Sequence, residues 1–116
     1  MPKRDLWYAD RPNRCEVCGK KGFVQAHHII KAQTVRRMGG DVWDPRNRLW
    51  LGQCCHGAHS NAARRLPLNV LPDSVFEFGT ELASAGWAFN RLRAEYSGDD
   101  PRLDALLGEE HVSRST

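Results

Sequence analysis

The hydrophobic and polar positions along the chain change their period near its middle. Residues 23–30 are rich in β-branched and aromatic side chains and predict a strand, and residues 48–51 predict a second one. Between them, residues 31–38 have the composition of one or two helical turns, and residues 44–47 predict a turn. Residues 55–65 contain no proline and no interior β-branched run, which favours a helix. The first half therefore has the order strand, loop, strand, helix.

The second half of the chain follows the helical period of about 3.6 residues. Ser74 and Glu77 fit a capping box at the start of a helix, which we expect to be interrupted at Gly86. Residues 101–107 predict a last short helix. The apolar stripe along these helices is typical of a packing surface rather than of a cofactor site. It comprises Val75, Phe78, Leu82, Trp87, Phe89, Leu92 and Tyr96.

These elements predict a single α+β domain. A chain of 116 residues can bury one core, and a bound metal ion would help to stabilise it. Trp7 and Tyr8 in the first segment are expected to dock on that core. The expected segments are a flexible N-terminal arm over residues 1–13, a ββα core over 14–65, a helical extension packed on that core over 66–108, and a disordered tail over 109–116.

The composition limits where the protein works and how its cysteines are used. No apolar run approaches the roughly 20 residues of a membrane span, and the first residues lack the apolar stretch of a secretion signal. We therefore expect a cytoplasmic protein without a membrane partner. Reducing conditions there disfavour disulfides and leave thiolates available for a metal ion.

Charge is distributed unevenly between the two halves. The net charge is +3, but residues 1–65 contain 13 Lys and Arg against 5 Asp and Glu, while residues 66–116 contain 4 against 9. A basic half favours a polyanionic partner such as nucleic acid, because phosphate contacts dominate that kind of binding. Taken alone, such a charge run is more often a solvated face.

Most of the metal-seeking side chains of the chain lie within this basic half. Thiolates and imidazoles are the ligands that zinc and similar ions prefer, and there are more of them here than one tetrahedral site can use. The pattern predicts two metal sites with different roles. The residues are Cys15, Cys18, His27, His28, Cys54, Cys55, His56 and His59.

In order and spacing these residues resemble the HNH endonucleases, the ββα-metal or His-Me finger nucleases, in a compact phage-type form. The resemblance covers about residues 14–65 and implies a ββα-metal fold with a zinc knuckle, followed by the C-terminal helices. Its motifs are the pair Cys15 and Cys18, Ala26-His27-His28-Ile29, Asn47-Arg48-Leu49-Trp50-Leu51, and Cys55-His56.

The resemblance implies a role for each residue of the catalytic site. His28 is the general base that deprotonates water, since histidine has the pKa nearest neutrality. His27 and His56 hold a divalent ion, Mg²⁺, Mn²⁺, Ni²⁺ or Zn²⁺, which stabilises the leaving 3′ oxygen as a Lewis acid. Asn47 pins the connecting loop through backbone hydrogen bonds and so keeps the base oriented.

The structural zinc site is expected to use Cys15, Cys18 and Cys55. Cysteine-rich members of the family usually have a second C-x2-C before the helix, and its first position is Gly52 in this chain. The fourth ligand could therefore be either Cys54 or His59. His59 is also a candidate for the catalytic ion, since many members of the family have a ligand four residues after the helix histidine and this chain has Ser60.

We expect a metal-dependent DNA endonuclease with low sequence specificity. Nothing resembles a code of base-reading side chains, so shape or end recognition is expected. The alternative is a zinc-stabilised DNA-binding or assembly module that does not cut, and RNA cleavage is a third hypothesis. The setting that the resemblance suggests is phage DNA processing or packaging in the host cytoplasm, with a terminase or other DNA-processing protein as partner; the oligomeric state is left open.

The candidate phosphate contacts are Arg36, Arg37, Arg46, Arg48, Arg64 and Arg65, of which the last two would equally suit a helix C-terminus.

Overall fold

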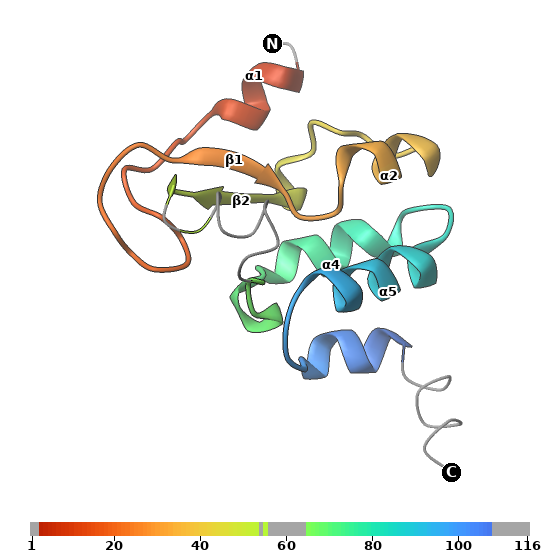
Figure 1. Ribbon diagram of the computed structural model, residues 1–116. Coiled ribbons are helices and arrows are strands. Elements are labelled where there is room, and N and C mark those ends of the chain that lie inside the picture. The colour runs from red at the N-terminus through yellow and green to blue at the C-terminus, as the bar shows by residue number, and fades with distance from the viewer. Residues whose placement is uncertain (1–2, 54, 56–64, 108–116) are drawn as a thin grey trace.

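The fold is built on a two-stranded antiparallel sheet, seen in a computed structural model that describes residues 3–53, 55 and 65–107 (Figure 1). Strand β1, Gln25–His28, pairs with β2, Arg48–Leu51, so that His28 lies opposite Arg48 and Gln25 lies opposite Leu51. The second strand has the predicted bounds. The first is shorter than predicted, because the backbone of Ile30 bonds to the side chain of Asn47 instead of to a strand.

Helices lie on both sides of this sheet and make the protein a small α+β fold. In Figure 1, helix α1 lies on one side of the sheet and helices α4 and α5 lie on the other. Residues 101–107 are also helical, as predicted. The helical elements are α1 (Lys3–Tyr8), α2 (Ala32–Arg37), η1 (Pro45–Asn47), η2 (Leu68–Val70), α4 (Asp73–Thr80) and α5 (Ala85–Glu95).

Helix α1 differs from the flexible arm that the sequence predicts. Its Trp7 is only 1% exposed, whereas the neighbouring Tyr8 stays 42% exposed, so one of the two aromatic residues docks. Arg48 Nη1 donates to the carbonyl oxygen of Trp7 over 2.7 Å, at the C-terminal end of the helix where carbonyl groups lack helical partners. Contacts that are distant in sequence therefore stabilise a helix that is too short to form alone.

One continuous hydrophobic core joins the two halves of the chain. It runs from Cys15 and Cys55 through Leu51 of the sheet to Phe89 and Leu92 of α5. The helical extension is thus packed on the sheet through shared side chains. Within the described residues no helix has the length and apolar character needed to cross a bilayer.

The capping box predicted at the start of α4 is not formed. Ser74 lies inside the helix, and its hydroxyl donates to the backbone oxygen of Arg46 over 3.0 Å. Glu77 accepts from the guanidinium of Arg46 over 3.1 Å. Both side chains therefore attach the helix to η1 instead of capping it.

The break between α4 and α5 falls at residues 81–84, and not at Gly86, which lies within α5. Gly79 allows the two helices to approach closely, because a Cβ atom there would lie 2.5 Å from Cε1 of Phe89.

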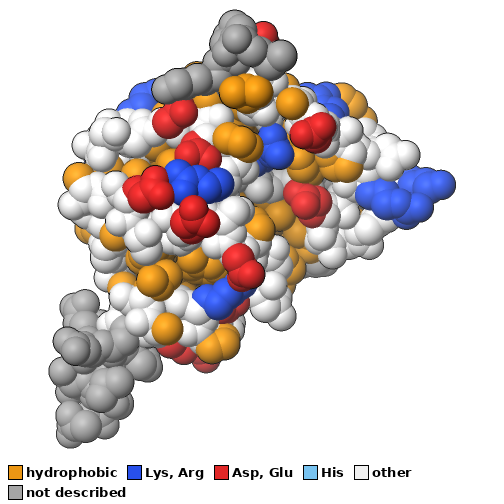
Figure 2. Space-filling model, turned by 180° about the vertical axis from the view of Figure 1, so that it is seen from behind, with side chains coloured by type: hydrophobic (Ala, Val, Ile, Leu, Met, Phe, Trp, Pro, Cys, Tyr) orange, Lys and Arg blue, Asp and Glu red, His pale blue; other side chains and the backbone are white. Residues whose placement is uncertain are grey.

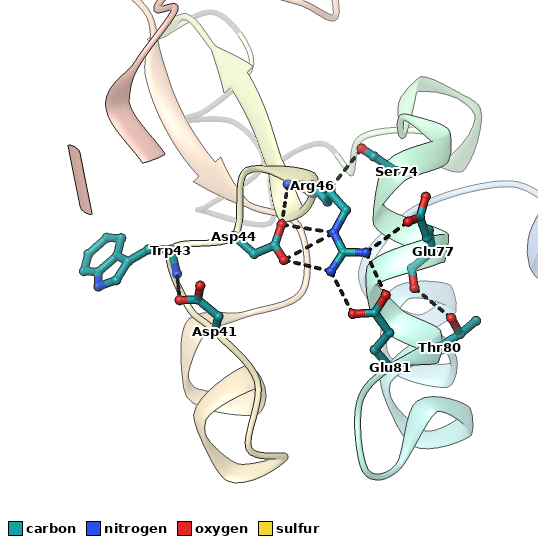
Figure 3. A network of polar contacts seen from close by, with 8 residues as sticks. All are labelled: Asp41, Trp43, Asp44, Arg46, Ser74, Glu77, Thr80 and Glu81. Atoms are coloured by element: carbon teal, nitrogen blue, oxygen red, sulfur yellow. Dashed lines mark hydrogen bonds and ion pairs between the residues drawn. The ribbon is translucent and has the colours of Figure 1, made fainter. Parts of the chain in front are cut away.

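Arg46 is the centre of the polar network that joins the loop before β2 to α4 (Figure 3). Its guanidinium bonds to Asp44 and Glu81, in each case over 2.8 Å, and also reaches Glu77. The bonds to Glu81 and Asp44 raise the pKa of Arg46 further above its ordinary value. The arrangement fixes the turn that precedes Asn47.

Arg102 attaches the last helix in a similar way. Its guanidinium donates to Asp100 over 2.8 Å and to the backbone oxygen of Leu71 over 2.7 Å, and it lies 4.5 Å from the ring centroid of Phe76. Asp100 is 3% exposed. The hydrogen bonds from Arg102 hold the pKa of Asp100 below its ordinary value, against the opposing effect of burial.

Replacing Arg102 by alanine should destabilise the protein by about 1–3 kcal/mol, because it leaves a buried carboxylate without its partner. The stabilisation from Asp100 is complete above its unfolded pKa of about 3.9 and is lost as the pH falls towards the lower folded value. Urea unfolding at several pH values should therefore show a difference between the variant and the parent at neutral pH that shrinks below about pH 4. Arg91→Ala, which removes an exposed pair with Glu95, is the control; equal stability of the two variants would contradict the role of Arg102.

Candidate metal centre and histidine pair

Three cysteines from the two ends of the first half meet beside the sheet. The Sγ atoms of Cys15, Cys18 and Cys55 all lie within 4.8 Å of one another, and these cysteines form no disulfide. A tetrahedral zinc ion with Zn–S bonds of about 2.3 Å places its sulfurs about 3.8 Å apart, so the cluster could hold such an ion after a small adjustment. The three predicted cysteine ligands are thus brought together.

The turn between Cys15 and Cys18 is fixed by the backbone. Gly19 has φ of +76°, which glycine adopts without strain, and its N–H donates to the oxygen of Cys15 over 2.9 Å. Glu16 connects this knuckle to β2, because its carboxylate accepts from the N–H of Trp50 over 2.7 Å. The cluster therefore has a fixed position relative to the sheet.

The thiol of Cys15 ionises more readily than an ordinary cysteine thiol, even without a bound metal ion. Burial opposes ionisation of its thiol, but hydrogen bonds from three backbone N–H groups and from a second thiol lower its pKa to about 6. At neutral pH this sulfur is a thiolate, which is the form that binds zinc. The donors are Cys18, Gly52, Val17 and Cys55.

Both residues predicted as a fourth ligand of the cysteine cluster lie outside the part of the chain that the structure describes. Both candidates, Cys54 and His59, fall there, as do His56 and Arg64. Among residues 3–53, 55 and 65–107, the three cysteines are the sole group that could hold a metal ion.

His28 is held by a hydrogen bond that determines its tautomer. Its Nε2 lies 2.9 Å from the backbone oxygen of Val42, and because a carbonyl only accepts, Nε2 carries the proton. Nδ1 then carries the lone pair. Burial lowers the pKa of His28, with a further lowering by the positive charge of Arg36, while the bond to Val42 opposes both. The imidazole is therefore neutral at pH 7 and has one nitrogen that can accept a proton.

Two tryptophans surround His28 on its face of the sheet. Trp7 stacks on the imidazole with ring centroids 4.1 Å apart and 19° between the planes. Trp43 approaches to 6.1 Å from both rings. The stacked indole buries one side of the imidazole and so contributes to its low pKa.

His27 faces the opposite side of the sheet, as the alternation along a strand predicts. Its Nε2 lies 3.0 Å from the hydroxyl oxygen of Tyr96, a buried residue just after α5. Burial raises the pKa of Tyr96, so its hydroxyl stays protonated. The pair gives His27 a fixed orientation towards the core side of the sheet.

Asn47 is fully buried and joins the loop to the end of β1. Its Oδ1 accepts from the N–H of Ile30 over 2.7 Å, and its Nδ2 donates to the oxygen of the same residue over 2.9 Å. Its own backbone oxygen accepts from Ile29 over 3.3 Å. These are backbone hydrogen bonds of the kind expected for this asparagine, directly after the histidine pair.

The predicted phosphate contacts are not equivalent. Three carboxylates already surround the guanidinium of Arg46, so among the described members of this set it is the arginine least available to phosphate. Arg48 and Arg65 also donate to backbone oxygens, those of Trp7 and Ala94, in each case over 2.7 Å. On the face seen from behind, acidic side chains lie next to several basic ones (Figure 2). Arg36 and Arg37 on α2 are exposed and form no hydrogen bond or ion pair within the described residues.

Sequence reasoning missed three partners of the histidine pair. Trp7 had only a general signal, an aromatic residue in a charged segment. Tyr96 was assigned to the apolar stripe, since its hydroxyl gives no periodic signal. The acceptor on Val42 is a backbone atom, so side-chain identity could not indicate it.

Known proteins give no independent guide to this site. No family model, curated protein or solved structure matches the chain.

Purified protein should contain about one zinc ion per chain held by the cysteine cluster. Cys55→Ser should lose that ion, because three thiolates from two segments are needed to bind it tightly. Elemental analysis measures the ratio, and thermal unfolding before and after chelation should show a large loss of stability. A serine variant that keeps the full zinc content would contradict the assignment.

Asn47→Ala should destabilise the protein by about 2–4 kcal/mol, because it leaves both backbone groups of Ile30 buried without their partner. Asn90→Ala, at an exposed position on α5, is the matched control and should change the free energy of unfolding by less than about 0.5 kcal/mol. Chemical denaturation measures both. Similar values for the two variants would show that the buried amide does not hold the loop.

Proposed function

We propose that the protein is a metal-dependent endonuclease of the HNH type that hydrolyses DNA phosphodiester bonds. The observation that carries the proposal is the environment of His28: its Nε2 lies 2.9 Å from the carbonyl oxygen of Val42, and burial lowers its pKa, which favours a neutral imidazole with the lone pair on Nδ1. A general base for water needs this combination near neutral pH. The resemblance described above supplies the reaction class.

The residues around His28 would keep it ready to accept a proton. The carbonyl of Val42 fixes the ring from one end, and the indole of Trp7 fixes its plane. Nδ1 of His28 takes the proton of the attacking water, and the positive charge that forms is partly balanced by the dipole of the Val42 carbonyl. Asn47 contributes indirectly, because it holds the end of β1 in place.

The proposed ligands of the catalytic ion are His27 and His56, with His59 as a further candidate. His27 is the described member of this set, and Tyr96 orients its ring. When bound, a divalent ion supplies Lewis-acid stabilisation of the leaving 3′ oxygen. The cysteine cluster is separate from this set and would hold a structural zinc ion, with Cys15, Cys18 and Cys55 as ligands.

A second candidate function is a zinc-stabilised DNA-binding or assembly module without cleavage activity. The observation that favours it is the position of Trp7, whose indole covers one side of His28. A substrate that approached from that side would have to displace α1. A pure binder would show salt-dependent affinity for DNA and no nicking with any ion.

His28→Ala should lower the rate of plasmid cleavage by at least about 100-fold in the presence of Mg²⁺, Mn²⁺, Ni²⁺ or Zn²⁺, because it removes the proton acceptor. Zinc content and circular dichroism should match the parent, since the side chain is only half-buried. His111→Ala, which changes the one histidine outside the motif, is the control and should cleave at the parental rate. Undiminished cleavage by His28→Ala would refute the proposed base.

A further inference from the structure

A row of aromatic and cationic side chains extends from His28 along α1 towards the zinc knuckle. We call it the aromatic row; it consists of Arg4, Trp43, Tyr8, Arg11 and Phe23. Arg4 lies 5.9 Å from the ring of Trp43, and the rings of Trp43 and Tyr8 are 6.4 Å apart. Arg11 continues the row, 5.9 Å from the ring of Tyr8 and 4.8 Å from that of Phe23. Each member thus contacts the next.

The aromatic row is unusually exposed for apolar side chains. Phe23 is 69% exposed and Tyr8 is 42% exposed, although this chain buries most of its large hydrophobic residues. Leu6 on the same short helix is 47% exposed as well. An exposed group of this kind indicates a binding surface rather than a packing defect.

A hollow of about 340 Å³ lies at the end of the row, beside the knuckle. Phe23, Lys20, Lys21, Gln25 and Gln53 line it, together with two glycines. The side-chain ammonium of neither lysine forms an ion pair or hydrogen bond with a described residue. The hollow therefore combines an aromatic face, free positive charge and hydrogen-bonding amides.

Charge along the segment favours an anion. Residues 1–25 contain six Lys and Arg, against the three carboxylates of Asp5, Asp10 and Glu16. The carboxylate of Glu16 is already used by the N–H of Trp50. Arg11 lies over the rings of Tyr8 and Phe23 and has no carboxylate partner among the described residues, so its charge stays available beside the aromatic faces.

We propose that the aromatic row and the hollow bind a single-stranded segment of nucleic acid. Bases stack on Phe23 and Tyr8, and phosphates contact Arg11, Lys20 and Lys21. Proteins that bind single strands without reading their sequence combine these same two elements, stacking platforms and positive charge. The proposal rests on the proposed nuclease function and names its substrate as a strand that is unpaired next to the cut.

The geometry connects this surface to the candidate base. Trp43, at one end of the row, lies 6.1 Å from the ring of His28. The hollow at the other end adjoins Gln25, three residues before His28 on β1, which corresponds to about 10 Å along a strand. A strand lying on the row would thus run within a few nucleotides of His28. A paired duplex would not present its base faces to the rings.

The test measures binding of the full zinc-loaded chain to a fluorescent single-stranded DNA oligonucleotide by anisotropy, without added divalent ion. Phe23→Leu should raise Kd by about 5- to 100-fold, whereas Phe23→Trp should stay within about twofold, because an aromatic face is retained. Trp87→Leu is the matched control: Trp87 is 49% exposed with Arg91 over its ring, and its loss should leave Kd unchanged.

The salt dependence and competing strands complete the test. The double variant Lys20→Gln with Lys21→Gln should reduce the slope of log Kd against log salt by about 1.4, if both lysines contact phosphates. Duplex DNA of the same sequence should compete at least about 10-fold more weakly than the single strand. Single-stranded RNA should compete about as well as single-stranded DNA, because stacking does not distinguish the sugars. Which of the two strands the protein cleaves then identifies its substrate.

Equal affinity of Phe23→Leu and the parent, or equal competition by duplex and single strand, would overturn the proposal. Zinc content verifies that each variant is folded. This experiment measures binding and not cleavage, so its result stands even if the protein is not a nuclease. If the aromatic row does not bind single strands, the cleavage test on His28 still stands.

Discussion

Two hydrogen bonds between the side chain of Asn47 and the backbone of Ile30 hold the centre of the protein together. They join the loop before β2 to the end of β1, where the histidine pair lies. Because Asn47 is completely buried, these bonds have no competition from water. The position of Val42, and therefore the tautomer of His28, depends on this loop.

Other contacts fix the same loop from outside. Arg46, next to Asn47, is bonded to α4 through carboxylates, and Ser74 of that helix donates to the oxygen of Arg46. On the opposite side, Glu16 attaches the cysteine knuckle to β2. The sheet is only two strands wide, so it needs this support from both sides to hold two imidazoles in fixed directions.

Much of this architecture could be predicted from the sequence. The bounds of β2 and the helix over residues 101–107 follow from local patterns, and the meeting of three cysteines follows from the family resemblance. Helix α1 could not be predicted, because six residues do not form a helix without the contacts of Trp7 and Arg48. Ser74 and Glu77 fitted a capping box, but both side chains bond to Arg46 instead of to the helix N-terminus.

The candidate site shows the same division. Side-chain types indicated the histidine pair and the family resemblance indicated Asn47, whereas the sequence did not show which atoms orient these side chains. A backbone oxygen holds His28, and an aromatic hydroxyl from the far end of α5 holds His27. Arg46 was expected to contact phosphate, yet its neighbours in space are carboxylates that lie 31 and 35 positions later in the chain.

The central claim is that His28 is a neutral imidazole with its proton on Nε2 and a free lone pair on Nδ1. Nitrogen-15 NMR of histidine-labelled protein at neutral pH measures this directly, because the two tautomers and the imidazolium have distinct ring-nitrogen shifts. The account predicts a protonated Nε2 and an unprotonated Nδ1 for His28. A proton on Nδ1, or a doubly protonated ring at pH 7, would contradict it.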